Sequence, residues 1–269
     1  MGEQRLRAVI FDWAGTLADY GSCAPAGVFV ALFQRWRVPI TIAQAREPMG
    51  IHKRDHVAAV LRMPEVAALW QQEYGRPPND GDVEAMYQDL IPLQLDCLPQ
   101  YADLIPGVLD AVHACRARGL KIGTTTGYNR EMLNVLLDAA RAQGFEPDCA
   151  VSADEVPGGR PHPYMCFRCA IELQVYPLAA CVKAGDTPPD IDEGRNAGMW
   201  TVAVAKTGNE LGLTEHEASA MADSELEELL NNAYDRLYAA GAHLVVDSIA
   251  DVPPVLDEIE ERLAAGERP

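Results

Sequence analysis

A chain of 269 residues, 48% of them hydrophobic, is long enough to form one sizeable domain or a core with a smaller domain beside it. Its net charge of -18 argues against nucleic acid and anionic membranes as partners, but leaves room for a locally basic pocket that binds an anionic substrate. No stretch approaches the ~20 apolar residues of a membrane span, and MGEQRLRAVIFDW enters a strand without a signal-like apolar segment, so we expect a cytoplasmic protein.

The first predicted element is a short strand at 7–11, RAVIF. About a hundred residues follow without a strand pattern, and they carry helical patterns at 25–36, 41–50, 52–63, 64–75 and 82–98. This is too long for a crossover helix, so we interpret residues 20–100 as a helical cap domain inserted after the first strand. There it would cover the carboxyl ends of the strands, and residues 1–19 and 101–269 would form the core domain.

Strand and helix patterns alternate in the rest of the chain. Helices are predicted at 107–118, 128–143, 161–174 and 188–197, and strands at 120–126, 149–156, 181–187 and 199–205. A late strand at 243–249 precedes a closing helix at 252–267. The alternation predicts an α/β fold with a doubly wound parallel sheet.

The seven cysteines are scattered and odd in number, which fits a reducing compartment better than a disulfide framework. Cys166 and Cys169 have the spacing of a zinc-binding pair. No second pair or downstream histidine pair accompanies them, and the surrounding HPYMCFRCAIELQV has the pattern of an amphipathic helix. Packing in the core is therefore the favoured interpretation.

Polar residues follow four of the predicted strands, at the edge where open parallel sheets place their functional crevice. They are Asp12, Thr126 with Gly127, Arg160 in GGRPHPYM, and Asp186 with Asp190 in GDTPPD. Each has an ordinary interpretation as a turn, a helix cap or a solvated loop residue. Together, a carboxylate nucleophile, a hydroxyl, a cation and an acidic pair predict phosphoryl transfer through an aspartyl-phosphate, with Mg²⁺ offsetting the negative charge.

These segments, FDWAGT, TTTG, GRPHP and GDTPPD, resemble the four sequence motifs of the haloacid dehalogenase superfamily. The resemblance implies a Rossmann-like core with a helical cap, Asp12 as the nucleophile, and Thr126 and Arg160 holding the phosphoryl group. It also implies Mg²⁺ bound by Asp12, Asp186 and the backbone carbonyl of Ala14, with Asp190 orienting the water ligands of the metal.

Ala14 departs from the phosphatases of that superfamily, which carry a second Asp at this position to protonate the leaving alkoxide. Alanine cannot donate a proton, and the loss of a general acid typically costs ~100- to 10,000-fold in rate. Either the protein is an impaired phosphatase, or its leaving group does not need that proton.

A carbon leaving group meets the second condition if its electron pair flows into an adjacent iminium, formed when a lysine condenses with a carbonyl beta to phosphorus. Residues 20–100 contain one lysine, Lys53. On a helix Lys53 shares a face with His56, a candidate proton shuttle, and with Met49 if the helix reaches back that far.

A lysine in this role must have a pKa below the ordinary ~10.4, which requires a desolvated or locally cationic site. The alternative from spacing alone is that Lys53 is a solvated helix lysine and His56 a packed surface histidine.

A closer resemblance joins FDWAGT, PMG-x-x-K-x-x-HV, TTGY-x-REM, GRP-x-P-x-MC and GDT-x-x-D-x-x-EGRNAGMW to the phosphonatase family of the superfamily. It implies a Schiff base between Lys53 and phosphonoacetaldehyde, transfer of the phosphoryl group to Asp12, and release of acetaldehyde and phosphate in 2-aminoethylphosphonate degradation. It places His56 and Met49 near the lysine, makes Gly127 and Tyr128 part of the substrate site, and implies a homodimer formed through the caps.

One departure from that family concerns the residue after DYG, where members can carry cysteine and this chain has Ser22, with Cys23 beside it. We therefore assign no catalytic thiol. The sequence leaves two other functions open: a Mg²⁺-dependent phosphatase or phosphomutase, which Ala14 argues against, and an inactive fold kept as a scaffold. Degeneration of the site would not be expected to spare Asp12, Thr126, Arg160, Asp186 and Asp190 together.

Overall fold

A computed structural model describes residues 5–269; the first four residues of the predicted core segment 1–19 lie outside this range. Within it, six parallel strands form one sheet in the order β3-β2-β1-β4-β5-β6. Their bounds are β1 (Ala8–Phe11), β2 (Lys121–Thr126), β3 (Cys149–Ser152), β4 (Cys181–Gly185), β5 (Trp200–Val204) and β6 (Leu244–Val246). The predicted doubly wound α/β fold is confirmed.

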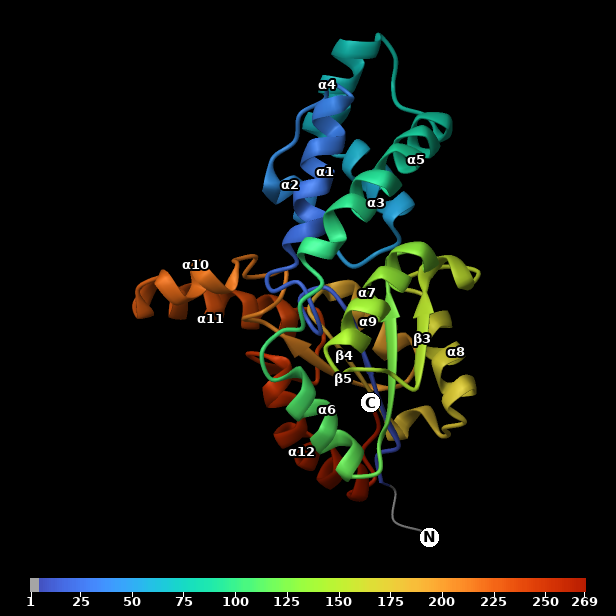
Figure 1. Cartoon of the computed structure of the whole chain (residues 1–269), viewed down its shortest axis with the longest axis vertical. Coiled ribbons are helices and arrows are strands. Elements are labelled where there is room, and N and C mark those ends of the chain that lie inside the picture. Colours follow the sequence, from blue (N-terminus) through green and yellow to red (C-terminus); the bar gives the residue numbers. More distant parts are fainter. Residues whose placement is uncertain (1–4) are drawn as a thin grey trace.

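Helices cover both faces of the sheet (Figure 1). Alternate residues of β1 point to opposite faces, so Val9 and Phe11 pack in one apolar cluster while Ala8 and Ile10 pack in another. The first face is covered by α6 (Val108–Ala117), α7 (Arg130–Ala142) and α12 (Val252–Ala264). The second is covered by α8 (Tyr164–Leu173), α9 (Pro188–Asn196) and α11 (Asp223–Ala239), and the short α10 (Glu215–Ala220) precedes α11.

Two details differ from or refine the sequence prediction. The third strand is shorter than 149–156, because the Ser152 backbone N–H and hydroxyl both donate to the Glu155 carboxylate and start a 3-10 turn at Ala153–Glu155. Cys166 and Cys169 lie on α8 in the apolar cluster between that helix and the sheet, as the core-packing interpretation expects. No helix among residues 5–269 is long and apolar enough to cross a membrane.

Of the six α-helices between β1 and β2 in the chain, the first five form a separate group above the sheet in Figure 1, whereas α6 packs on the sheet. These five are α1 (Cys23–Arg35), α2 (Ile42–Arg46), α3 (Lys53–Leu61), α4 (Pro64–Tyr74) and α5 (Asp80–Cys97). Their apolar faces bury Phe29, Leu32, Trp70 and Leu90. These helices lie within residues 20–100, and the interpretation of that segment as a cap domain stays a prediction.

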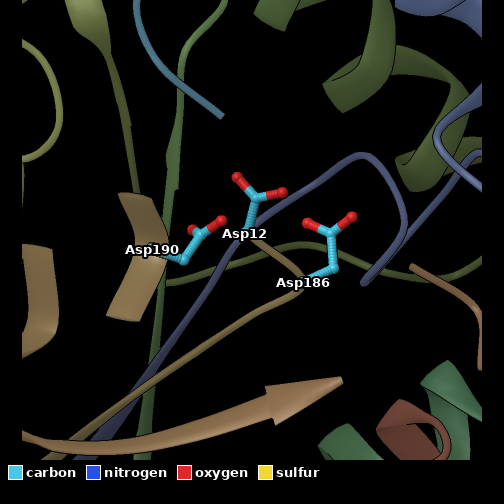
Figure 2. Close-up of side chains that lie close together, drawn as sticks. All are labelled: Asp12, Asp186 and Asp190. Carbon is cyan, nitrogen blue, oxygen red and sulfur yellow. The ribbon is translucent and has the colours of Figure 1, made fainter. Parts of the chain in front are cut away.

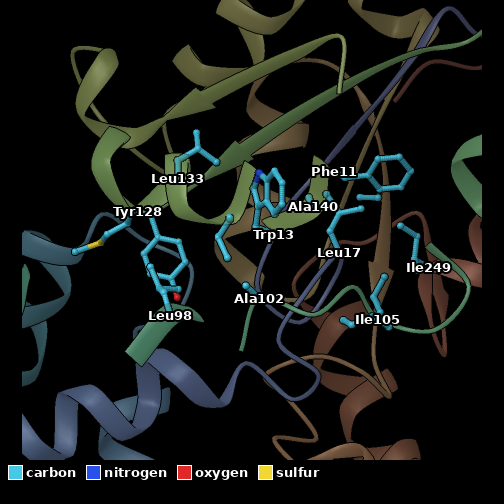
Figure 3. Packing of buried hydrophobic residues seen from close by; sticks show 14 of the residues in the cluster. Phe11, Trp13, Leu17, Leu98, Ala102, Ile105, Tyr128, Leu133, Ala140 and Ile249 are labelled. Carbon is cyan, nitrogen blue, oxygen red and sulfur yellow. The ribbon is translucent and has the colours of Figure 1, made fainter. Parts of the chain in front are cut away.

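The two chain segments that join this helical group to the sheet run side by side. The Ile105 N–H donates to the Leu17 carbonyl at 2.9 Å, and Ala18 pairs with Leu104 in an isolated bridge. Figure 3 shows Leu17 and Trp13 packed in the same cluster as Ala102 and Ile105. The apolar core therefore continues from the sheet into the connection with the helical group.

The segment before α3 lies so close to the edge of the sheet that two positions at the contact have no room for a side chain. A Cβ at Gly127 would lie 2.4 Å from the Ile51 carbonyl oxygen. A Cβ at Gly50, whose φ is +94°, would lie 2.2 Å from Thr187 Oγ1. The helical group is therefore closed over the carboxyl ends of β2 and β4.

Candidate active site

Three carboxylates meet at the carboxyl ends of the central strands. Asp12 directly follows β1, Asp186 directly follows β4, and Asp190 lies in the first turn of α9. One oxygen from each lies within 4.8 Å of the others, and Figure 2 shows the three side chains converging from different segments. The chain can turn this tightly after β1 because Gly15 adopts a φ of +80°, and a Cβ there would lie 2.2 Å from Asp186 Oδ2.

Two buried cations neutralise this site in part. Arg160 Nη2 lies 2.6 Å from Asp12 Oδ1 and 3.0 Å from Asp190 Oδ1. Lys183 Nζ lies 2.6 Å from the same Asp190 oxygen. A fourth carboxylate, Glu193, accepts from Arg160 Nε at 2.8 Å. Two cations therefore face four carboxylates, and the site holds more negative than positive charge when all are ionised.

This imbalance appears in the pKa values. Burial, partly offset by Arg160, raises the pKa of Asp12 to about 6. Burial and the neighbouring carboxylates Asp12 and Asp190 raise the pKa of Asp186 well above its ordinary value. Burial opposes ionisation of Asp190 as well, but Arg160 and Lys183 hold its pKa below the usual range.

A divalent cation fits such a site. The three converging groups offer carboxylate oxygens, the ligands that hard cations such as Mg²⁺ prefer, and an ion of charge +2 would offset the excess negative charge. Asp12, Asp186 and Asp190 could therefore hold a metal ion. Ala14, whose carbonyl is the further predicted ligand, lines the same cavity as Asp12 and Asp186.

The Arg160 side chain is fixed by acceptors on every side. Besides Asp12 and Glu193, it donates to the Thr125 carbonyl at 3.0 Å and the Thr125 hydroxyl at 2.9 Å. Its Nη1 donates to the Gly50 carbonyl at 3.1 Å, which ties it to the segment before α3. The guanidinium thus has one orientation, with its charge directed at Asp12.

Sequence reasoning missed three residues of this network: Thr125, Lys183 and Glu193. Lys183 carried a signal, because it is a charge inside the otherwise apolar and small run CVKAG of a central strand. Glu193 lies three residues after Asp190 on α9, so both share a helix face. Thr125 carried none, because alternation alone does not say which threonine of TTT approaches Arg160.

A small cavity brings most of the predicted residues together. It has a volume of about 20 Å³, room for about one water molecule. The predicted residues that line it are Asp12, Ala14, Met49, Lys53, Thr126, Gly127, Tyr128, Arg160 and Asp186. Ser22 also lines it, whereas Cys23 does not and its thiol lies 3.6 Å from the Tyr20 carbonyl.

Lys53, the first residue of α3, is 4% exposed. Its Nζ lies 3.9 Å from Met49 Sδ and 4.8 Å from the centre of the Tyr128 ring. Burial lowers the pKa of this amine to about 8, although Asp12 partly opposes the shift. The helix does not reach back to Met49; the contact arises from the turn that precedes α3.

His56 lies one turn further along α3 and does not line the cavity. Its Nε2 lies 2.9 Å from the Ala45 carbonyl, and its ring stacks on Phe29 with the ring centres 3.7 Å apart. Burial and the nearby Lys53 lower the pKa of His56 well below its ordinary value. The buried Nδ1 has no hydrogen-bond partner among the described residues. The imidazole is therefore neutral and packed behind the lysine.

The chain is similar in sequence to proteins of known family. Residues 6–198 match the family model of haloacid dehalogenase-like hydrolases. The chain is 47% identical to a phosphonoacetaldehyde hydrolase of Paraburkholderia xenovorans, over 99% of this chain and 100% of the relative. It is 45% identical to one from Bacillus cytotoxicus, over 96% and 98%.

Among solved structures, a phosphonoacetaldehyde hydrolase-like protein from Oleispira antarctica has a TM-score of 0.96 and 40% identity, over 98% of this chain and 96% of that one. A β-phosphoglucomutase from Clostridium difficile has a TM-score of 0.68 and 17% identity, over 97% and 99% of the two chains. At 17% identity, the similarity to the phosphoglucomutase shows a shared fold and nothing about function.

Replacing Lys183 with methionine tests whether this lysine balances the buried carboxylates. Lys183→Met should lower the free energy of unfolding by about 3–5 kcal/mol, because it leaves Asp190 and Glu193 buried with too little positive charge. Urea unfolding measures this difference.

Lys121→Met is the matched control, because that lysine is exposed at the start of β2. Lys121→Met should lower the free energy of unfolding by less than about 1 kcal/mol. Equal effects of the two substitutions would contradict the proposed charge balance.

Proposed function

Because the chain belongs to the haloacid dehalogenase-like hydrolases, and within them to the phosphonoacetaldehyde hydrolase family, we propose that it cleaves the carbon–phosphorus bond of phosphonoacetaldehyde. The products are acetaldehyde and phosphate, in the degradation of 2-aminoethylphosphonate. The observation that carries the proposal is that Lys53 and Asp12 line one small cavity, whose wall includes Ala14 where a phosphatase would have an acid.

Lys53 supplies the electron sink. Its buried amine, with a pKa of about 8, is neutral in about a tenth of the molecules at pH 7, far more than a solvated lysine would be, and can attack the aldehyde carbon. Loss of water from the adduct gives a protonated imine, the iminium. Burial outweighs the carboxylates Asp12, Asp19 and Asp186, which favour the charged amine, and so lowers its pKa. Met49 and the Tyr128 ring surround it with polarisable, uncharged contacts.

Asp12 then attacks phosphorus. The carbon–phosphorus bond breaks, its electron pair moves into the iminium to give an enamine, and the phosphoryl group is carried as an aspartyl-phosphate. Protonation of the enamine carbon and hydrolysis of the imine release acetaldehyde and regenerate Lys53. Hydrolysis of the aspartyl-phosphate releases phosphate, so that the net reaction consumes one water molecule. His56 donates no proton directly in this scheme, because it lies outside the cavity and acts on the position of Lys53 instead.

Arg160 and Thr126 hold the phosphoryl oxygens. Both line the cavity beside Asp12, and the fixed guanidinium keeps its charge where negative charge builds up as the nucleophile approaches. Gly127 leaves the space that the Ile51 carbonyl fills, and the Tyr128 ring forms the wall below the Lys53 amine.

Mg²⁺ is the proposed cofactor, held by Asp12, Asp186 and the carbonyl of Ala14, with Asp190 orienting its water ligands. When bound, it offsets the repulsion between an anionic nucleophile and an anionic phosphonate. The excess of buried carboxylates over cations supports this assignment. The raised pKa values of Asp12 and Asp186 point the same way, because burial disfavours these ionised carboxylates and a bound cation would offset that cost.

Residues 20–100 act as the cap that opens to admit the substrate, and residues 1–19 and 101–269 act as the catalytic core. A cavity of about 20 Å³ supports such a movement, because it is too small for phosphonoacetaldehyde to enter.

The protein is a homodimer that pairs through its caps, where Ile42, Leu69 and Tyr74 are exposed apolar residues. It is cytoplasmic, which its seven free cysteines support.

Reductive trapping tests the Schiff base. Borohydride added to the enzyme with phosphonoacetaldehyde should reduce the imine to a stable adduct on Lys53, which peptide mass spectrometry locates. Lys53→Arg should lose the adduct and at least ~100-fold in turnover, because a guanidinium does not condense with the aldehyde at this pH. Lys121→Arg serves as the control and should keep both. An adduct on another lysine, or full activity in Lys53→Arg, would overturn the assignment.

The pH dependence follows from the lowered pKa of Lys53. The neutral amine attacks the aldehyde, so kcat/KM should rise with pH and level off above about 8. A solvated lysine would place the same rise near ~10.4. The measurement is phosphate release at limiting substrate between about pH 6 and 10. A rise in kcat/KM with its midpoint above pH 10 would show that Lys53 is not desolvated in the working enzyme.

A further inference from the structure

Arg46, the last residue of α2, reaches from the cap to the core. Its Nη1 donates to the Gly21 carbonyl at 2.7 Å and to Asn209 Oδ1 at 3.0 Å. Its Nη2 donates to the Gly212 carbonyl at 3.0 Å. Gly21 lies at the start of the cap segment 20–100, before α1, whereas Asn209 and Gly212 belong to the loop that follows β5. One guanidinium therefore joins α2, the start of the cap segment and the core.

Asn209 is the point where this contact meets the carboxylate cluster. Its side-chain oxygen accepts from Arg46, and its amide nitrogen lies 3.4 Å from the Arg46 carbonyl. Its backbone N–H donates to Asp186 Oδ2 at 2.8 Å. The residue is 7% exposed, so water does not readily replace either contact. A displacement of Asn209 by the cap is thus transmitted to Asp186 through one residue.

The same loop also fixes the turn after β1. The Thr207 hydroxyl donates to the Gly15 carbonyl at 2.8 Å, and the Thr207 carbonyl accepts from the Gly21 N–H at 2.7 Å. The loop 207–212 therefore contacts the turn beside Asp12, the start of the cap segment, Asp186 and α2. It is placed to respond to the position of the cap.

The chemistry of the contact suits a bond that forms and breaks. Among the described residues, Arg46 forms no ion pair within 4.0 Å, and its oxygen acceptors are carbonyls and a neutral amide. A charged donor on neutral acceptors gains less than a buried ion pair, so its separation costs less free energy. Arg160, by contrast, holds three carboxylates inside the core.

We propose that Asn209 is a positioning residue that couples closure of the cap, through Arg46, to the placement of Asp186 for the metal ion. With the cap closed, Arg46 holds the Asn209 side chain and the Asn209 N–H holds the Asp186 carboxylate in place. With the cap open, the Asn209 side chain loses Arg46 as a partner, and the Asp186 carboxylate is held less firmly. The inference rests on the proposed function, because that function gives the helical group its role as a cap and the cluster its Mg²⁺.

The test measures Mg²⁺ binding without substrate, so its result does not depend on turnover. Arg46→Met removes the contact from the cap side. Calorimetry should therefore show about 5- to 20-fold weaker Mg²⁺ binding. In turnover, the KM for Mg²⁺ should rise by a larger factor than kcat falls. Arg54→Met is the matched control, because Arg54 is a cap arginine whose Nε binds Glu84 within the cap at 2.9 Å. It should leave the Mg²⁺ affinity unchanged.

Asn209→Ala should weaken Mg²⁺ binding by a similar factor, and the double variant should be no weaker than either single one, because both remove the same contact. Asn209→Asp keeps an acceptor for Arg46 and should restore most of the affinity. By reciprocity, Mg²⁺ should slow amide hydrogen exchange at residues 42–52 in the unchanged protein and not in Arg46→Met.

Several results would overturn the coupling: an Arg46→Met variant with unchanged Mg²⁺ affinity, additive effects in the double variant, or no binding of Mg²⁺ by the unchanged protein. If Asn209→Ala does not fold, Arg46→Met and the exchange experiment still decide the matter. Coupling without turnover of phosphonoacetaldehyde would overturn the proposed function alone, and turnover without coupling would overturn this inference alone.

Discussion

The constraint on which the rest of the structure depends is the burial of four carboxylates against two cations at one edge of the sheet. Burial in a medium of low polarity penalises each unpaired charge, so the site has a place for a divalent cation and raised pKa values at Asp12 and Asp186. Arg160 cannot leave without exposing Asp12, Asp190 and Glu193 to one another. The glycine at position 15 is required because the turn after β1 must bring Asp12 and Asp186 together.

The same burial, imposed by the cap, explains Lys53. A lysine that closes over an acidic site would ordinarily form an ion pair and stay charged, yet this amine faces a thioether and an aromatic ring, and desolvation lowers its pKa. In the proposed mechanism, cap closure shields the phosphoryl site from water and prepares the amine as a nucleophile. Ala14 fits that mechanism, because an iminium would accept the electron pair that an acid would otherwise have to protonate.

Much of this arrangement could be predicted from the sequence, and what could not has a physical reason. Asp12, Arg160 and Asp186 were predicted together because parallel strands end at one edge, whatever the details of packing. The charge balance by Lys183 and Glu193 was missed, because local spacing does not report which distant charges meet. His56 shares a helix face with Lys53 as predicted, but stacking on Phe29 turns it away from the cavity. Met49 reaches Lys53 without the helix extension that the spacing required, since a turn brings it there.

The central claim is that a cap lysine replaces the missing acid, so that the bond broken is carbon–phosphorus. The most direct test compares phosphate release with Mg²⁺ from phosphonoacetaldehyde and from a small phosphate ester, each as kcat/KM. The account predicts a preference for phosphonoacetaldehyde of at least ~100-fold, because the ester leaves as an alkoxide that Ala14 cannot protonate. Faster turnover of the ester would contradict it.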